Sequence, residues 1–261
     1  MGSVPTRIAV TRAVSSAMQS CELTHLARAP IDVDRARLQH ASYERTLERL
    51  GCRIVRLAEE SALADSVFVE DTAIVLDEIA LITRPGAQSR RGETPTVAQA
   101  LGQYRELAYL QAPATLDGGD VLRVDRTVYV GISTRSNEAA VQQLRDLLPR
   151  FGYRVQSVPV FGCLHLKSAV TQLAEGLLLV NPQFIDPSHF PGVDFLPVDP
   201  AEPFAANAMM IGEEVIYSAS HPATASRMRE HGVRVQTVEM SEMEKAEGAV
   251  TCCSLVFSME A

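Results

Sequence analysis

Short polar turns recur at similar intervals along this chain, each between two runs of apolar, β-prone residues. We expect such turns at residues 77–78, 125–126, 175–176 and 213–214. Their separations are roughly 40 to 50 residues, a period that indicates repeated supersecondary units. Two β-prone runs joined by a polar turn predict an antiparallel hairpin, so we expect several similar hairpins along the chain.

Helices and further strands are predicted between the hairpins. The residue pattern predicts helices at 32–50, ending at Gly51, and at 94–101, 136–151 and 222–231. Strands are predicted at 52–57, 153–160 and 233–240, and the last hairpin, 248–257, needs the N-terminal strand at 7–13 to complete its unit. About five such units around one axis predict an α/β fold, a closed pseudo-symmetric propeller made by a single domain, residues 1–261.

Composition narrows the class of protein. The chain has 261 residues, 46% hydrophobic and 21% charged, so it can bury a core. Its formal net charge is -8 and no block of Lys or Arg occurs, which argues against nucleic acid or an anionic membrane as a partner. No apolar run approaches the roughly 20 residues that span a bilayer. The five cysteines form no disulfide framework, and we expect a reduced, cytoplasmic protein.

The sequence contains no motif typical of a metal or cofactor site. CxxC, HExxH, GxGxxG and GxxxxGK[ST] are all absent. The glycine pair Gly118 and Gly119 lies next to carboxylates, which would repel a phosphate group. We therefore expect no metal and no cofactor. The oligomeric state stays open, with a homodimer as one candidate.

Each predicted hairpin opens with polar side chains in an apolar context. Charges flanked by Val, Leu and Ile are costly to bury unless they are paired or used. Equivalent positions of pseudo-symmetric units meet near the axis, so these side chains are predicted to share one central pocket. Singly, each has an ordinary structural explanation: a turn, a core histidine, a packed thiol. The polar residues that open the units are Glu70 and Asp71, Asp117 and Asp120, His165, Asn207, and Cys252.

Two adjacent cysteines, Cys252 and Cys253, lie in the last of these segments. A disulfide between neighbours would strain the backbone. In a strand, their side chains would point to opposite faces. We therefore expect one thiol to pack in the core and the other to face the pocket.

A cysteine, a histidine and carboxylates together suit a cationic electrophile. The thiolate attacks carbon, and the histidine protonates the leaving group and then activates water. Carboxylates beside the cysteine would raise its pKa, which suits an ester or peptide substrate poorly. A guanidinium matches carboxylates in a bidentate manner, and its positive charge would lower the thiol pKa on arrival. These residue types therefore favour a guanidine-modifying site.

Five segments make this interpretation more specific. "DSVFVED", "ALITRPGAQSRRGE", "TLDGGDVL", "LHLKS" and "TCCS" occur in this order along nearly the whole chain. They resemble the dimethylarginine dimethylaminohydrolases (dimethylargininases) of the guanidino-group-modifying superfamily. The resemblance implies a five-bladed α/β propeller. It also implies hydrolysis of Nω-methylated L-arginine to L-citrulline plus methylamine or dimethylamine, so that the partner is a small-molecule substrate.

The resemblance assigns catalytic roles to matching positions. Cys252 would be the nucleophile and His165 the general acid and base. Asp71 and Asp117 would hold the guanidinium, with Asp117 also placed to assist His165.

The resemblance also assigns residues to the amino-acid end of the substrate. Two arginines would bind the α-carboxylate, and Asp65 and Glu70 would line the amino-acid end, with Asp65 near the α-ammonium. An N-terminal loop would lie over the mouth, and a backbone carbonyl would complete the set. The two arginines are Arg90 and Arg135, the loop residue is Leu23, and the backbone carbonyl belongs to Ala246.

Lys167 helps to predict whether the substrate is methylated arginine or arginine itself. Arginine deiminases of the superfamily carry an aspartate two residues after the catalytic histidine, where this chain has Lys167. One carboxylate fewer suits a guanidinium with methylated nitrogens. The alternatives are an arginine deiminase, or a hydrolase of another substituted guanidino compound. A non-enzymatic arginine-binding module is disfavoured by the intact set of Cys252, His165 and Asp117.

Overall fold

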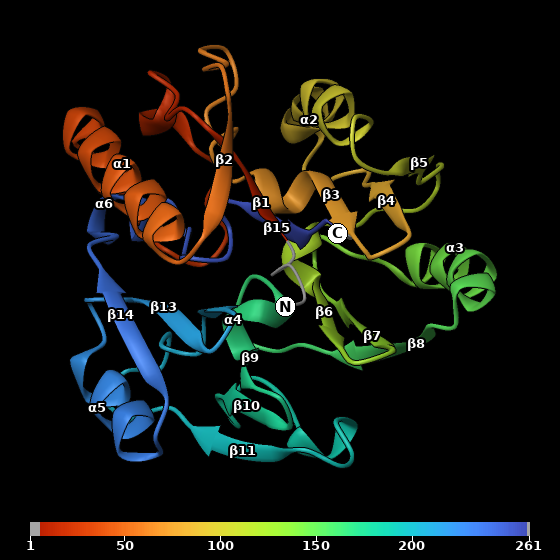
Figure 1. Ribbon diagram of the computed structural model, residues 1–261. Helices are drawn as coiled ribbons and strands as arrows, with labels where there is room; N and C mark the ends of the chain where they lie inside the picture. The colour runs from red at the N-terminus through yellow and green to blue at the C-terminus, as the bar shows by residue number, and fades with distance from the viewer. Residues whose placement is uncertain (1–5, 260–261) are drawn as a thin grey trace.

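The structure is a computed structural model that describes residues 6–259. Within this range the strands form five three-stranded sheets arranged around a common centre, with the longer helices on the outside (Figure 1). This arrangement is the five-bladed α/β propeller that the sequence predicts. In chain order, the strands of the first four sheets are β3 (Ala73–Val75), β4 (Ile79–Ile82) and β5 (Glu106–Tyr109); β6 (Val121–Val124), β7 (Thr127–Ile132) and β8 (Arg154–Pro159); β9 (Val170–Ala174), β10 (Leu177–Val180) and β11 (Asp194–Pro197); and β12 (Ala208–Ile211), β13 (Glu214–Ser218) and β14 (Arg234–Val238).

The fifth sheet joins the two ends of the chain. It consists of β15 (Leu255–Ser258), β1 (Arg7–Arg12) and β2 (Cys52–Leu57), with β1 in the middle. In this sheet β1 is antiparallel to β15 and parallel to β2. The other four sheets repeat the pattern, an antiparallel hairpin whose second strand pairs in parallel with a third. The predicted closure by the N-terminal strand is therefore confirmed.

Helices make most of the crossovers to the outer strands, as parallel pairing requires. The helix α1 (Val33–Arg49) begins after Asp32, whose carboxylate caps the Arg35 N–H, and ends at Gly51, which has a φ of 87°. The crossover between β10 and β11 contains only a short 3₁₀ turn. The other helices are α2 (Thr94–Leu101), α3 (Glu138–Leu147), α4 (Leu166–Ala169), α5 (Pro222–Glu230) and α6 (Ser241–Glu244), and the 3₁₀ segments are Met18–Ser20, Val69–Thr72, Gln88–Glu93, Gly118–Asp120, Leu148–Phe151 and Pro187–His189.

The polar residues that open the units lie in turns instead of strands. Val69–Thr72 and Gly118–Asp120 are 3₁₀ turns, and the cysteine pair lies in a turn before β15. The expectation of a strand at these positions is wrong. A buried carboxylate or thiol that faces the axis does not fit the alternation of apolar side chains in a strand. The polar residues therefore lie in a turn, and the hydrogen-bonded strand begins after them.

Apolar side chains pack in five clusters between neighbouring sheets and helices. Leu144 of α3, for example, is fully buried against β6 and β7. Among residues 6–259, no helix combines the length and the hydropathy that crossing a membrane would require.

Candidate active site

The catalytic candidates come from the inner ends of four different sheets. Asp71 precedes β3, Asp117 precedes β6, His165 precedes β9 and Cys252 precedes β15. The remaining sheet, β12–β13–β14, contributes indirectly through the side chain of Asn207, just before β12. Its amide donates to Thr251 Oγ1 at 2.9 Å and its carbonyl oxygen accepts from the Thr251 N–H at 3.1 Å. Pseudo-symmetry therefore brings together residues that lie far apart in the sequence.

Asp71, Asp117 and His165 form the centre of the site. Each is buried, and one polar atom of each lies within 4.8 Å of the other two. His165 Nε2 lies 3.1 Å from Asp117 Oδ2, while Asp71 Oδ1 accepts from the Gly119 N–H at 2.9 Å. A Cβ on Gly119 would lie 2.6 Å from His165 Nδ1, so only glycine lets the imidazole approach the backbone here.

Two oxygens and one nitrogen at this spacing form a donor set that metals also use. Here each donor has a protein partner, because Asp117 bonds His165 and Asp71 bonds Gly119 and Arg90. The pKa of His165 is also raised, as shown below, and a protonated imidazole cannot bind a metal. The residues therefore fit an organic cation better than a metal ion, and the expectation of no metal stays a prediction.

Cys252 lines a small cavity together with His165 and Asp71. Its side chain is almost buried, and its carbonyl oxygen accepts from the Glu70 N–H at 3.1 Å. Cys253 is fully buried in the hydrophobic core, where its thiol lies 3.6 Å from the Ala249 carbonyl oxygen. The two thiols thus have different surroundings, as the sequence predicts, although the two cysteines lie in a turn and not in a strand.

The electrostatics of the site keep the thiol and the imidazole protonated. Burial, together with the carboxylates of Glu70 and Asp71, raises the pKa of Cys252 well above its ordinary value. For His165, burial alone would lower the pKa, but Asp71, Asp120 and Asp117 outweigh burial and raise it to about 9. The resting site therefore holds a neutral thiol beside an imidazolium.

Asp71 remains ionised in this buried place. Burial by itself would raise its pKa, but the positive charges of His165 and Arg90 lower the pKa below its ordinary value. Arg90 Nη1 lies 2.5 Å from Asp71 Oδ2. Asp71 still has free lone pairs, because each carboxylate oxygen can accept more than one hydrogen bond.

Arg90 lines the cavity but is already held by the protein. It makes a bidentate pair with Glu93, through Nε–Oε1 at 3.1 Å and Nη2–Oε2 at 2.8 Å, and donates to the Phe68 carbonyl oxygen at 3.0 Å. Glu93 was missed by sequence reasoning, although its spacing of three residues from Arg90 in "SRRGE" is a usable signal. Burial raises the pKa of Glu93 to about 7 despite the opposing effect of Arg90.

Arg135 lines the same cavity and is less engaged. Its Nη2 donates to Thr24 Oγ1 at 3.1 Å, and its Nη1 lies 3.7 Å from Asp117 Oδ2. Of the two arginines expected to bind a carboxylate, Arg135 therefore has more donors available.

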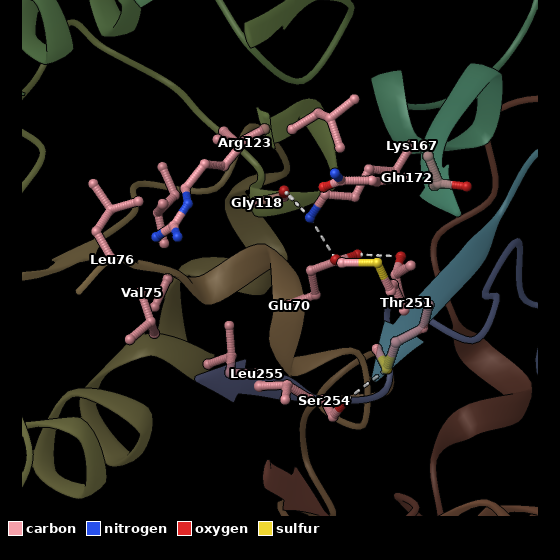
Figure 2. A pocket seen from close by; sticks show the side chains of 18 of the residues that line it. Glu70, Val75, Leu76, Gly118, Arg123, Lys167, Gln172, Thr251, Ser254 and Leu255 are labelled. Carbon is pink, nitrogen blue, oxygen red and sulfur yellow. Dashed lines mark hydrogen bonds and ion pairs between the residues drawn. The ribbon is translucent and has the colours of Figure 1, made fainter. Parts of the chain in front are cut away.

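Glu70 lines a second cavity, which Figure 2 shows, and does not line the small cavity beside Cys252. Its Oε1 accepts from Lys167 Nζ at 2.6 Å and its Oε2 from Thr251 Oγ1 at 2.8 Å. Lys167 also donates to the Gly118 carbonyl oxygen at 3.1 Å. These groups line a separate cavity of about 280 Å³, in which Glu70 is paired with Lys167.

The residues expected at the amino-acid end lie around a short loop, residues 22–26. Asp65 and Ala246 line the small cavity, and Asp65 Oδ2 accepts from the Glu22 N–H at 3.1 Å. From the loop, Glu22 reaches the cavity, whereas Leu23 packs against the hydrophobic core. The cavity measures only about 20 Å³. An amino-acid ligand needs far more room than this cavity offers as it stands.

Asp120 is a buried residue near the site that sequence reasoning left without a role. Its Oδ2 accepts from Ser133 Oγ and Ser136 Oγ, each at 2.6 Å, and its Oδ1 accepts from the Leu166 N–H at 2.9 Å. Asp120 therefore anchors the start of α4, directly after His165.

The pH dependence of kcat/KM is expected to reflect these protonation states. In the reaction that the sequence predicts, Cys252 attacks as a thiolate while His165 is protonated, so below about pH 9 the resting site would have to lose one proton. We expect kcat/KM to rise up to tenfold per pH unit between pH 6 and 8 and to level off near pH 9. Initial rates over that range measure this. A flat profile from pH 6 to 8 would mean that the thiolate–imidazolium pair already exists in the free enzyme.

Solved structures and known sequences were compared with the chain. One solved structure, the dimethylarginine dimethylaminohydrolase of Pseudomonas aeruginosa in a cysteine-to-serine variant with citrulline, matches with a TM-score of 0.93 and 30% identity. The match covers 97% of this chain and 100% of that one. The N-terminal domain of ArgZ, an arginine dihydrolase from cyanobacteria, matches with a TM-score of 0.85 and covers 97% and 98% of the two chains, but its 19% identity shows the fold alone. Fold and site thus define an enzyme of the guanidino-group-modifying superfamily.

The sequence comparisons narrow this class to one family. The model of the family "N,N dimethylarginine dimethylhydrolase, eukaryotic" matches residues 13–188. The N(G),N(G)-dimethylarginine dimethylaminohydrolase of Streptomyces coelicolor is 40% identical over 97% of both chains. The chain therefore belongs to the dimethylarginine dimethylaminohydrolase family, and the resemblance seen in its motifs is confirmed.

Proposed function

We propose that this protein hydrolyses Nω-methylated L-arginine to L-citrulline and methylamine or dimethylamine. The observation that carries this proposal is the acidic, buried surrounding of Cys252. Burial, together with Glu70 and Asp71, raises the pKa of this thiol, so a cation that binds beside it favours the thiolate. A guanidinium brings that charge on the same carbon that the thiolate then attacks.

The proposed reaction assigns one step to each residue. The substrate guanidinium binds Asp71 and the thiol of Cys252 loses its proton. The thiolate attacks the central guanidinium carbon, and His165 protonates the departing amine, which leaves a thiouronium on Cys252. The neutral His165 then takes a proton from water, which attacks the same carbon. Collapse of this intermediate expels the thiolate, which takes up the hydroxyl proton of the intermediate, and yields citrulline. The proton that the thiol gave to solvent at the start is taken up by the released amine in water.

Three further residues have supporting roles in this proposal. Asp117 holds the imidazole through its 3.1 Å contact. Arg135 binds the α-carboxylate with donors that the protein leaves free. Asp65 binds the α-ammonium once the loop N–H has moved off its carboxylate. The site uses all five sheets, so we propose that the propeller acts as a single catalytic domain.

The preference for methylated substrates rests on the Lys167–Glu70 pair. Because Glu70 is neutralised by Lys167 and bonded to Thr251, it is not available to hold the outer nitrogens of an unsubstituted guanidinium. Methyl groups on those nitrogens therefore do not remove a hydrogen bond to Glu70. An arginine deiminase would need a second carboxylate in the same place.

A substrate panel tests the proposed function. We expect citrulline from asymmetric dimethylarginine and monomethylarginine, and at least about tenfold less from arginine, a difference of about 1.4 kcal/mol in the activation free energy. Citrulline and the released amine are quantified at equal substrate concentrations. Turnover of arginine alone would reassign the chain to deimination. If no panel member yields citrulline, methylarginine hydrolysis is wrong.

A further inference from the structure

The carboxylate of Glu247 binds three consecutive backbone N–H groups of the loop 22–26. Its oxygens accept from Thr24 at 2.9 Å, from His25 at 2.5 Å and from Leu26 at 2.6 Å. The loop and Glu247 lie more than 220 residues apart in the sequence. One side chain thus satisfies three donors that would otherwise bond only water.

Glu247 lies in the turn that follows α6, and its backbone has a left-handed conformation. Its φ is 58°, in the left-handed region that only glycine, asparagine and aspartate enter readily. The turn that follows α6 enforces this conformation, because the Gly248 N–H bonds the Met243 carbonyl oxygen at 3.0 Å. A non-glycine residue in such a conformation is often found at a functional site.

The loop that Glu247 holds touches both ends of the proposed substrate-binding set. The Glu22 N–H bonds Asp65, and Thr24 Oγ1 accepts from Arg135. A further contact runs from Ser89 Oγ to Glu22 Oε1 at 2.6 Å. Glu247 also lines the cavity of about 20 Å³ next to Cys252. Releasing its three hydrogen bonds would free the loop and enlarge the space that an amino-acid ligand needs.

We propose that Glu247 is a positioning residue that holds the loop 22–26 closed over Cys252 and the bound substrate. This inference rests on the proposed function. Glu247 touches no reacting atom. It acts through the loop, by setting how often the loop opens and how firmly Asp65 and Arg135 are covered.

Glu247→Gln tests this role, because an amide keeps the shape but loses the charge that strengthens the three bonds. We expect KM for dimethylarginine to rise roughly three- to thirtyfold, with kcat changed less than about threefold. In the free enzyme, alkylation of Cys252 by iodoacetamide, located by mass spectrometry, is expected to become at least about threefold faster, since the loop opens more often.

Glu244→Gln is the matched control. Glu244 ends α6, and its carboxylate bonds Ser218 Oγ and Ser220 Oγ, not the loop. The control removes one negative charge from the same turn, so KM and the alkylation rate should stay near those of the parent enzyme. Equal changes in both variants, or no change in Glu247→Gln, would overturn the proposal.

Glu247→Gly separates positioning from folding. Glycine suits a φ of 58°, so the unfolding midpoint is expected to stay close to that of the parent while KM and the alkylation rate rise as in Glu247→Gln. A lower midpoint with an unchanged alkylation rate would assign Glu247 a structural role only. The alkylation measurement needs no turnover, so it tests the loop contact even if methylarginine proves not to be the substrate.

Discussion

Replacing Cys252 with serine is expected to abolish citrulline formation, while replacing Cys253 with serine leaves it nearly unchanged. A serine hydroxyl in this acidic, buried place would lose its proton far less readily than the thiol does, so Cys252→Ser should lower kcat by at least about a thousandfold. Cys253 faces the core and its thiol donates to the Ala249 carbonyl oxygen. A hydroxyl can make the same bond, so kcat should stay within about threefold.

The paired design controls for packing. Both substitutions remove one sulfur atom from the same turn, and thermal unfolding of each variant reports the structural cost. Steady-state rates with dimethylarginine then separate chemistry from folding. Equal losses in both variants would mean that the turn, and not one thiol, carries the effect. Retained activity in Cys252→Ser would remove the nucleophile from the proposed mechanism.

The sequence predicted the repeat because hairpins depend on local rules. Alternating apolar residues and polar turns specify β3–β4 or β6–β7 without reference to the rest of the chain. Pseudo-symmetry then predicts from the sequence alone that four residues lie near one axis: Asp71, Asp117, His165 and Cys252. The fold class and the family are confirmed, whereas the individual roles of these residues remain proposals.

Contacts between distant segments could not be predicted in this way. Tyr43 in α1 donates to the Val250 carbonyl oxygen at 2.8 Å and so supports the cysteine turn. The ion pair between Glu70 and Lys167 likewise joins two segments that lie 97 residues apart. Such pairs depend on how sheets pack against each other, and local propensity carries no information about packing.

The polar openings of the units show why a strand was the wrong expectation for them. "VFVED" and "VTCCS" are rich in β-prone residues, but their polar members are buried at the axis. Asp71 and Cys252 each need a specific direction toward the cavity, which a 3₁₀ or other turn supplies. At the inner end of each sheet, the direction that the site requires of these side chains thus outweighs the local preference for a strand.

Replacing His165 with glycine is expected to separate the two halves of the reaction. Loss of the general acid should slow turnover of dimethylarginine by about a hundred- to ten-thousandfold, because the amine leaves poorly without a proton. S-methyl-L-thiocitrulline avoids this barrier, since methanethiol departs without a general acid. In His165→Gly, Cys252 should therefore still attack the central carbon of this compound, expel methanethiolate and form the thiouronium, whereas hydrolysis of the thiouronium, which needs His165 to activate water, should stall.

Intact-protein mass spectrometry of quenched mixtures is expected to show an adduct equal to the compound minus methanethiol, and peptide mapping should locate it on Cys252. The double variant His165→Gly with Cys252→Ser is the control and should carry none. An adduct on Cys253 would reverse the assignment of the two thiols. Absence of any adduct at pH 9, where a larger share of the thiol is ionised, would argue against covalent catalysis and favour direct attack by water on the bound guanidinium. Because the pKa of Cys252 is held high by burial and two carboxylates, adduct formation should also accelerate as the pH rises.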